Sequence, residues 1–482
     1  MSIYLGIDLG TSATKTVLTD AAGRVLARGR ATHRKTPAGG RVDTGSWADS
    51  VREACLDLGG AAARATAVGL AVHCPVAVLM DRDGTATAPG LCWDHDALPA
   101  LMERYNEVRA NGLAERVGNV AHPSTSMGLA WRFFAEHEPD SARRASTLGF
   151  VGTWLGRLLT GRDALDPTQA SYSGLFGTTD REGDWLDAML DGTGVPRAAL
   201  PPIRPSLSEL GPLLPGPAEA LGLRAGIPVV VGAADTAAAA YLIGLDEGRG
   251  PLYTVGTTHV ITRSTAVPDP APRALQRADV RPGRWLWHAA TNGGIALAAA
   301  ARLLGHGDAV EKMIDLAGAA TPRQAAAAPV FVPHTTPERA PFWFDRPRTA
   351  LVGHLPDTDP CSAAWGCVEG VAFAARLMLS MTEPDGAGGP GSAGGGRLFL
   401  AGSFGAEAAY ARMVADLFGR EVDLINESCL PAMGAAAIAA RTVDGVPPAP
   451  PPSVRLVPRP DRAPLARSRW NTFTEVWSRI TK

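Results

Sequence analysis

A short turn rich in glycine and threonine, placed between two strands, occurs near the N-terminus and again past the middle of the chain. The first copy joins the expected strands Ile3–Asp8 and Thr14–Thr19, and the second joins Leu252–Val255 to His259–Arg263. Short apolar runs that flank a glycine turn are typical of β-hairpins. Because the pattern restarts, the sequence predicts two similar α/β halves that face one cleft.

The length of 482 residues also favours two large domains over one. We place their boundary near residue 245, which gives domains 1–244 and 245–482. Apolar residues make up 46% of the chain and charged residues 20%, as in ordinary globular proteins. The stretch Glu383–Gly396 is expected to be a flexible loop. It contains a formal GxGxxG match that follows no strand and opens no helix, so no dinucleotide site is predicted there.

Charge and composition exclude several classes of protein. The net charge is −2 and only four residues are lysines, so no basic face for nucleic acid or membrane is expected. The first residues run directly into a strand, so no signal peptide is expected. No apolar run is long enough to span a bilayer. Six scattered cysteines without a CxxC pair suggest neither disulfides nor zinc. A cytoplasmic protein is expected, and a homodimer is compatible with the sequence.

A phosphate site is predicted at the first turn, although no GxxxxGK[ST] sequence occurs. Within Gly6–Ser12, Asp8 closes a strand and small residues follow, whose backbone N–H groups can approach an anion. An aspartate beside a triphosphate requires a cation, so Asp8 is predicted to hold Mg²⁺ through water, with Lys15 close by. The alternative is an ordinary hairpin turn.

A second and a third segment extend this interpretation to ATP. The turn Gly256-Thr257-Thr258 matches the first one, as a triphosphate held between two hairpins requires. Gly402–Gly405 follows the expected strand Leu398–Ala401, precedes the expected helix Ala406–Leu417, and would let the backbone pack against a base and ribose. The residues predicted to hold ATP are Asp8, Gly10, Thr11, Ser12, Lys15, Gly256, Thr257, Thr258, Gly402, Ser403, Phe404 and Gly405.

One carboxylate stands alone at a junction between a strand and a helix. The expected strand Leu223–Val231 ends at Gly232-Ala233-Ala234, and Asp235 precedes the alanine-rich helix Thr236–Ile243. Such junctions expose functional side chains in α/β folds. Asp235 is therefore the candidate catalytic residue, and the alternative is a cap of the following helix.

Taken together in their order, these segments resemble the FGGY carbohydrate kinases, which include xylulose, ribulose and glycerol kinases and belong to the sugar kinase, Hsp70 and actin superfamily. The resemblance covers essentially the whole chain. It rests on Gly6–Ser12, Leu159-Thr160-Gly161 with Asp166 and Ala170, Gly226-Ile227-Pro228-Val229, Gly232-Ala233-Ala234-Asp235, Gly256-Thr257-Thr258, Glu369-Gly370, Gly402–Gly405 and Gly434-Ala435-Ala436.

The resemblance implies two actin-like (ribonuclease H-like) domains around a central cleft. ATP would be held mainly by the C-terminal domain and a sugar or polyol acceptor mainly by the N-terminal one. Asp235 would contact the acceptor and take the proton from its hydroxyl. Because a carboxylate is a weak base beside an alcohol, most of the catalysis would come from positioning and from neutralising phosphate charge.

The expected acceptor site departs from the family in two segments. Where members carry a Trp-Asn-Asp-x-Arg-like segment, this chain has Trp93-Asp94-His95-Asp96-Ala97, without the arginine. We expect Trp93 to form an apolar wall and Asp94 or Asp96 to bind acceptor hydroxyls; metal ligation is the alternative. His73 stands near the family's glutamine position and is expected either to face the acceptor or to pack structurally. An unusual acceptor is expected, rather than that of a standard xylulose kinase.

Other parts of the chain leave alternatives open. The segment Pro333–Pro341 resembles the family's Gly-Glu-Arg-x-Pro loop, which lies near the cleft, and is interpreted as structural. A chaperone or filament protein of the same superfamily would share the phosphate hairpins but would not need Asp235. A non-catalytic or ATPase-only relative that senses ATP and sugar is the second alternative, and the presence of both Asp8 and Asp235 argues against it.

Overall fold

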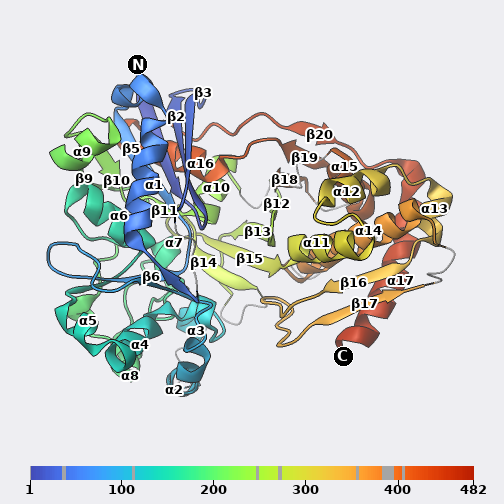
Figure 1. Ribbon diagram of the computed structural model, residues 1–482, viewed down its shortest axis with the longest axis horizontal. Helices are drawn as coiled ribbons and strands as arrows, with labels where there is room; N and C mark the ends of the chain where they lie inside the picture. The colour runs from blue at the N-terminus through green and yellow to red at the C-terminus, as the bar shows by residue number, and fades with distance from the viewer. Residues whose placement is uncertain are drawn as a thin grey trace.

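The computed structural model describes residues 2–34, 39–110, 114–245, 249–269, 274–353, 358–382, 396–403 and 408–482. Two large sheets form the centres of two halves that lie side by side (Figure 1). The first sheet contains β3 (Val25–Thr32), β2 (Ala13–Asp20), β1 (Ile3–Leu9), β5 (Ala67–Val72), β10 (Pro228–Val230) and β9 (Glu209–Pro212), with β11 (Ala233–Ala234) beside β5. The second contains β14 (Leu275–Ala278), β15 (Trp285–Thr291), β13 (His259–Thr265), β12 (Leu252–Val255), β18 (Leu398–Gly402), β19 (Val422–Ile425) and β20 (Val454–Leu456).

The two sheets repeat one topology. In the first, β3, β2 and β1 are antiparallel, and β5 and β10 continue the sheet parallel to β1. In the second, β15, β13 and β12 are antiparallel, and β18 and β19 follow parallel to β12. The carboxyl ends of the parallel strands therefore bring the two glycine turns to corresponding edges. This repeat confirms the predicted α/β fold with two similar halves.

Helices cover both sheets, and two smaller sheets complete the molecule. A four-stranded sheet joins β4 (Arg41–Val42), β7 (Gly90–Cys92), β6 (Val76–Met80) and β8 (Thr147–Phe150), and β16 (Val330–His334) pairs with β17 (Arg348–Val352). The helices are α1 (Thr44–Leu56), α2 (Leu98–Ala110), α3 (Ala114–Val117), α4 (Ala130–His137), α5 (Pro139–Arg144), α6 (Val151–Thr160), α7 (Pro167–Ala170), α8 (Asp187–Thr193), α9 (Pro215–Leu221), α10 (Asp235–Ile243), α11 (Gly293–Leu303), α12 (Val310–Gly318), α13 (Pro322–Ala327), α14 (Pro360–Thr382), α15 (Ala408–Phe418), α16 (Leu430–Asp444) and α17 (Ala463–Thr481).

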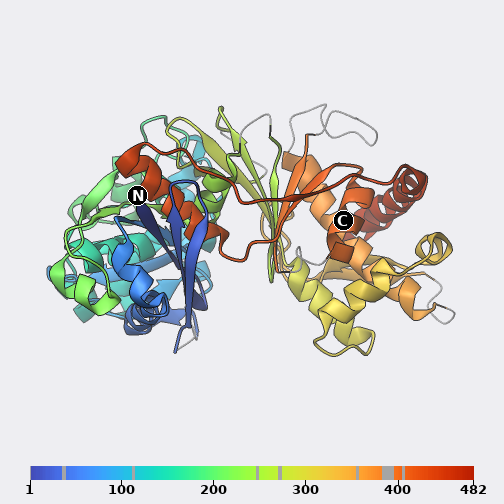
Figure 2. The ribbon, with the colours of Figure 1, turned by 90° about the horizontal axis from the view of Figure 1, so that it is seen from above.

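Helix α16 comes late in the chain but packs on the first sheet. It contacts β1, β5 and α10, and both ribbon views show it beside the first strands (Figures 1 and 2). Glycines make this close approach possible. A Cβ added at Gly6 would lie 1.8 Å from the Ala432 carbonyl oxygen, and one added at Gly69 would lie 1.9 Å from that of Ala435. The domain boundary near residue 245 remains a proposal. The packing of α16 shows that residues 245–482 contribute a helix to the half formed by residues 1–244.

Replacing Gly69 with alanine is expected to destabilise the protein by about 3 kcal/mol, because the new methyl group would overlap a backbone atom and force α16 away from β5. Thermal unfolding measures the effect. Gly60→Ala is the matched control, since an added Cβ there meets nothing within 4 Å. Equal melting temperatures for the two variants would contradict the close packing of α16.

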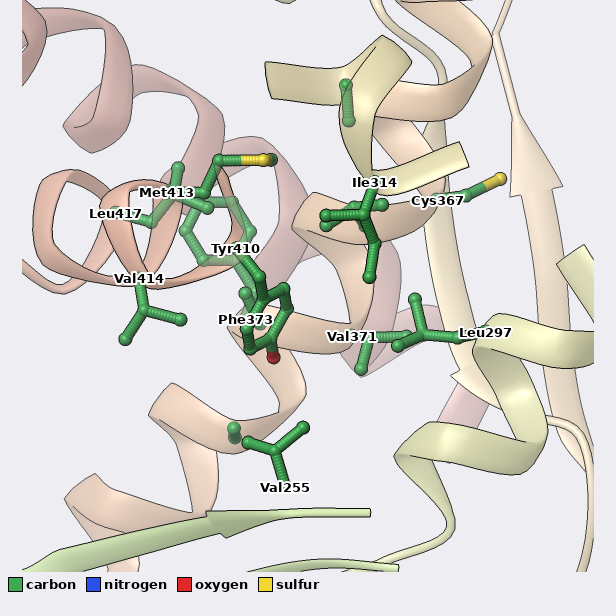
Figure 3. Close-up of a cluster of buried hydrophobic side chains, with 14 of the residues drawn as sticks. Val255, Leu297, Ile314, Cys367, Val371, Phe373, Tyr410, Met413, Val414 and Leu417 are labelled. Atoms are coloured by element: carbon green, nitrogen blue, oxygen red, sulfur yellow. The ribbon is translucent and has the colours of Figure 1, made fainter. Parts of the chain in front are cut away.

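The core of the second half surrounds helix α14. Val371, Phe373 and Cys367 of this helix are buried with Tyr410 and Met413 of α15 (Figure 3). Among the described helices, only α14 is long and apolar enough to cross a bilayer, and 78% of its most apolar window is buried inside the protein. Its composition is therefore explained by its place in the core.

The C-terminal helix α17 docks on the same half, as predicted. The indole of Trp477 donates to His334 Nε2 at 2.9 Å, and Arg469 pairs with the buried Glu369. The sequence predicts this helix over Asn471–Ile480, docked through Trp477 and Ile480. It begins earlier, at Ala463, because Pro464 suits the first turn of a helix.

Two other predictions are affected by the structure. The strand expected over Leu223–Val231 begins only at Pro228. The residues before it form a turn, in which Gly226 has a φ of 80° that favours glycine. The loop predicted at Glu383–Gly396 lies, except for its last residue, outside the described residues, as do Phe404 and Gly405. All six cysteines are free thiols, as expected.

Candidate functional site

A cavity of about 390 Å³ lies between the two halves. It brings together predicted site residues from both of them: Lys15 and Asp235 from the first half, and Gly402 and Ser403 from the second. Its lining comprises Lys15, Asp235, Thr236, Ala239, Thr254, Val260, Ala401, Gly402, Ser403, Asn426, Glu427, Ser428, Leu430 and Pro431. A larger cavity, of about 770 Å³, lies between residues 167–206 and 278–285 and contains none of the predicted site residues.

Two contacts beside this cavity join the halves. Lys15 Nζ donates to the Ser428 carbonyl at 2.8 Å, and Arg28 forms an ion pair with Glu427 at 2.7 Å. Both partners belong to the connection between β19 and α16. The connection between β19 and α16 therefore lines the cavity and is bound to the first half.

Asp8 is a buried carboxylate with an unsatisfied oxygen. It lies near the end of β1, opposite Lys15 in β2, and its Oδ1 has no hydrogen-bond partner. Burial, together with the neighbouring Asp235, raises the pKa of Asp8 to about 7, and Lys15 opposes this shift. A buried carboxylate without a partner is costly, and a divalent cation relieves that cost. The donor set here, one carboxylate beside a phosphate-sized turn, fits Mg²⁺, which keeps several waters.

Two histidine side chains bind backbone carbonyls at the first turn. His73 Nδ1 donates to the Leu9 carbonyl at 2.8 Å, and His33 Nε2 donates to the Gly10 carbonyl at 2.9 Å. The His73 ring also packs edge-on against Trp47, with 5.3 Å between centroids, and burial lowers the pKa of His73 to about 4. This arrangement favours the structural reading of His73. The contribution of His33 was missed, because no local pattern links it to the turn.

In the first turn, Thr11 and Ser12 are exposed and Gly10 is half-buried, which leaves their backbone open to a ligand.

The second turn is built on the start of α11. The Thr257 carbonyl accepts from Gly294 N at 3.1 Å, and a Cβ at Gly294 would lie 2.0 Å from the Gly256 carbonyl oxygen. Thr257 is exposed, and Thr258 is half-buried. Gly402 pairs with Val255 in the sheet and therefore lies beside this turn. Gly293-Gly294 was not predicted to belong to the site, although paired glycines at a helix start are a visible signal.

Asp235 is the first residue of α10, directly after β11, as predicted. Its Oδ1 accepts from Thr236 N at 2.6 Å and from Thr236 Oγ1 at 3.1 Å. The N-cap is Ala234, so Asp235 does not occupy the capping position of the alternative reading. Burial raises the pKa of Asp235, which brings this carboxylate closer to the range of a useful base.

The backbone just before Asp235 is fixed by a buried network. Asp166 caps α7 and accepts from Thr168 N at 2.9 Å and from Gln169 N at 3.2 Å. The side chains of Thr168 and Gln169 also donate to the Asp166 carboxylate. Thr168 Oγ1 in turn accepts from Ala234 N at 2.8 Å. Asp166 therefore positions the strand end that carries Asp235.

The segment Trp93–Ala97 forms a turn after β7. Asp94 and Asp96 are exposed, whereas His95 packs against Phe133 with 4.7 Å between ring centroids. Within the described residues, no group of three or more histidine, cysteine or acidic side chains could hold a metal. The metal-ligand alternative for this segment is therefore not supported.

Trp93 itself meets a segment of the second half. The guanidinium of Arg339, from residues 335–347 between β16 and β17, lies 5.0 Å from the centre of the Trp93 ring. His122 packs between Trp93 and Trp343, with 6.2 Å and 5.4 Å between ring centroids. The segment around Arg339 was interpreted as structural, and the fold brings it to the wall expected to bind the acceptor.

Comparison with protein families gives one consistent result over most of the chain. Residues 3–242 match the N-terminal domain of the FGGY family of carbohydrate kinases, and residues 252–443 match its C-terminal domain. The xylulose kinase of Streptomyces coelicolor is 30% identical over 485 aligned residues, which cover 98% of this chain and 91% of that protein. An autoinducer-2 kinase of Escherichia coli is 30% identical over 295 residues, covering 58% of this chain and 54% of that protein.

Among solved structures, a xyloylose kinase from Brucella ovis has the same architecture. It superposes with a TM-score of 0.86 at 22% sequence identity, and the match covers 99% of each chain. This likeness confirms the predicted fold of two actin-like domains around a central cleft.

Proposed function

Because the chain belongs to the FGGY family of carbohydrate kinases, ATP-dependent enzymes that phosphorylate a hydroxyl of a sugar or polyol, we propose that its cleft carries out this reaction with Asp235 as the base. The observation that supports this most directly is the place of Asp235. It stands in the wall of the cavity between the halves, opposite Gly402 and Ser403. The ATP would lie along the second half, and the acceptor hydroxyl would face Asp235.

Asp8 is the proposed ligand of Mg²⁺, directly or through water. When bound, the ion would neutralise part of the charge on the phosphates. The turns Gly10–Ser12 and Gly256–Thr258 are proposed to hold the phosphates through backbone N–H groups, and Lys15 to contribute a positive charge. Gly402 and Ser403, and by resemblance Phe404 and Gly405, would accommodate the nucleoside.

Asp235 is needed as a base only late in the chemical step. As the acceptor oxygen bonds to the γ-phosphorus and the bond to the ADP oxygen breaks, the hydroxyl becomes acidic and its proton passes to the carboxylate. The hydrogen bonds from Thr236 hold one carboxylate oxygen, which leaves Oδ2 to face the acceptor. Closure of the two halves would exclude water from the phosphoryl group.

The acceptor is proposed to differ from that of a standard xylulose kinase. The family's arginine after Trp93 is replaced by Ala97, and the exposed Asp94 and Asp96 are the candidate contacts for hydroxyls at the rim. We propose a cytoplasmic enzyme with a small-molecule acceptor and without nucleic-acid or membrane partners.

The function is tested by ATP consumption with pentuloses, hexuloses, pentitols, glycerol, cyclitols and sugar acids in the presence of Mg²⁺. Acceptor-dependent formation of ADP and of a phosphorylated acceptor, seen by mass spectrometry, is the expected result. Binding of ATP without turnover of any acceptor would instead indicate the non-catalytic relative.

A further inference from the structure

Two arginines from the second half reach the region where the acceptor is expected. Arg339 lies over Trp93, as described above. Arg277, from the edge strand β14, is only 1% exposed, and its guanidinium carbon lies 3.8 Å from the centre of the Tyr172 ring. Trp93 and Tyr172 both belong to the first half. The two cations therefore cross from one half to the other at this point.

Arg277 is only partly satisfied by its surroundings. Its Nη1 donates to Asn119 Oδ1 at 3.0 Å, to the Gln276 carbonyl at 2.8 Å and to the Ser171 carbonyl at 3.4 Å. Its Nε and Nη2 are buried and have no hydrogen-bond partner in good geometry, and the Tyr172 side chain under the guanidinium is the polar group that interacts with it. Two donors of one buried guanidinium thus remain available, which is rare unless a ligand uses them.

Neither arginine has an acidic partner. In the part of the chain that the structure describes, no carboxylate lies within ion-pair distance of Arg277 or Arg339. The nearby Glu338 is bound instead by Thr291, the Asn292 backbone and His334. Burial lowers the pKa of both arginines, and the charge of Arg277 adds to the effect on Arg339. A buried positive charge without a counter-ion is unfavourable, and a second charge of the same sign nearby adds to the cost.

The same region adjoins Asp235. Tyr172, which lies under Arg277, packs against the cluster of buried side chains that contains Ala233 and Ala234, directly before Asp235. Asn119, which accepts from Arg277, lies three residues before His122, whose ring packs against Trp93. The two arginines therefore lie along one stretch of the interface between the halves, and that stretch adjoins the proposed base. A neutral polyol placed there would leave both cations uncompensated, whereas a carboxylate would accept their hydrogen bonds in the bidentate manner that arginine favours.

We propose that the acceptor is a polyhydroxy carboxylic acid, whose carboxylate is bound by Arg339 and Arg277 while a hydroxyl of the same molecule faces Asp235. The inference rests on the proposed function and names its substrate class. The reaction is otherwise unchanged: the acceptor oxygen bonds to the γ-phosphorus, ADP leaves, and the hydroxyl proton passes to Asp235.

The experiment compares aldonates with the matching alditols, as xylonate with xylitol, ribonate with ribitol and gluconate with glucitol, at equal ionic strength and saturating ATP. Wild-type kcat/KM is expected to favour at least one acid over its neutral counterpart by about 10- to 100-fold, the value of a charge-assisted hydrogen-bond pair. Arg339→Met is expected to abolish this preference, mainly through KM for the acid, and Arg339→Lys to keep part of it. Arg346→Met, an exposed arginine of the same segment, is the matched control.

Three results would overturn the proposal: no preference of the wild type for any acid, an equal loss for acids and alditols in Arg339→Met, or an increase in KM for ATP rather than for the acid. Calorimetry with a non-hydrolysable ATP analogue separates this outcome from failure of the proposed function. An acid that binds through Arg339 without being phosphorylated would support the acid site and contradict the kinase reaction. Turnover of neutral polyols alone would support the kinase reaction and contradict the acid site.

Discussion

Asp235→Asn is expected to lower kcat by about 10²- to 10⁴-fold, because it removes the proposed proton acceptor while keeping the size of the side chain. The KM for ATP should change by no more than about 3-fold, since the loss falls on the transition state. Steady-state kinetics with the best acceptor and a separate ATP-binding titration measure the two effects. Asp191→Asn, an exposed carboxylate of α8, is the control and should behave as the wild type.

The pH profile gives a second readout of the same substitution. Because burial raises the pKa of Asp235, the acid limb of kcat in the wild type should lie above the ordinary range of an aspartate. At saturating Mg²⁺, which keeps Asp8 ionised, the limb should disappear in Asp235→Asn. A variant that keeps wild-type kcat, or that loses ATP binding together with kcat, would show that Asp235 is not the base.

Asp8→Asn is expected to stabilise the protein without ligands and to inactivate it. The pKa of Asp8 is raised to about 7 by burial and by Asp235, against 3.8 in a free side chain. Removing this buried charge should therefore raise the free energy of unfolding by on the order of 4 kcal/mol at pH 8. Loss of the proposed Mg²⁺ ligand should lower kcat by about 10²-fold or more. Thermal unfolding and an activity titration with Mg²⁺ test both parts.

The pH dependence of this stability difference has a defined sign. Below about pH 4 the carboxyl is protonated in the folded and the unfolded protein, so Asp8→Asn and wild type should be equally stable. As the pH rises towards 7, only the unfolded wild type ionises, and its folded state loses stability. Above pH 7 the difference should be constant. Addition of Mg²⁺ with an ATP analogue should stabilise the wild type alone, and a variant less stable than the wild type at pH 8 would contradict the buried-charge argument.

The features that could be predicted from the sequence depend on residues close together in the chain. The strand β1 with Asp8 near its end, and the turn at Gly256–Thr258, follow from short apolar runs broken by small residues. Asp235 could be located because a single carboxylate interrupts a glycine- and alanine-rich junction between a strand and a helix. Their roles remain proposals, but their places in the fold follow from local propensity.

The features that could not be predicted depend on contacts between distant segments. Nothing near Arg339 in the sequence indicates that it reaches Trp93, and nothing near His33 links it to the Gly10 carbonyl. Gly69 is a partial exception. A glycine inside an apolar strand weakens the strand unless another backbone comes close. That signal was present, but it does not say that the approaching segment is α16.

The position of α16 also has a consequence for the newly made chain. Strands β1 and β5 leave the ribosome long before residues 430–444 are synthesised, so the groove over Gly6 and Gly69 stays uncovered until translation is nearly complete. Contacts between segments so far apart slow folding and leave apolar surface exposed to aggregation. A nascent chain that stops at residue 244 would lack the helix that covers its own central strands. The first half is therefore the earlier one to be made, but it can reach its native packing only together with the second.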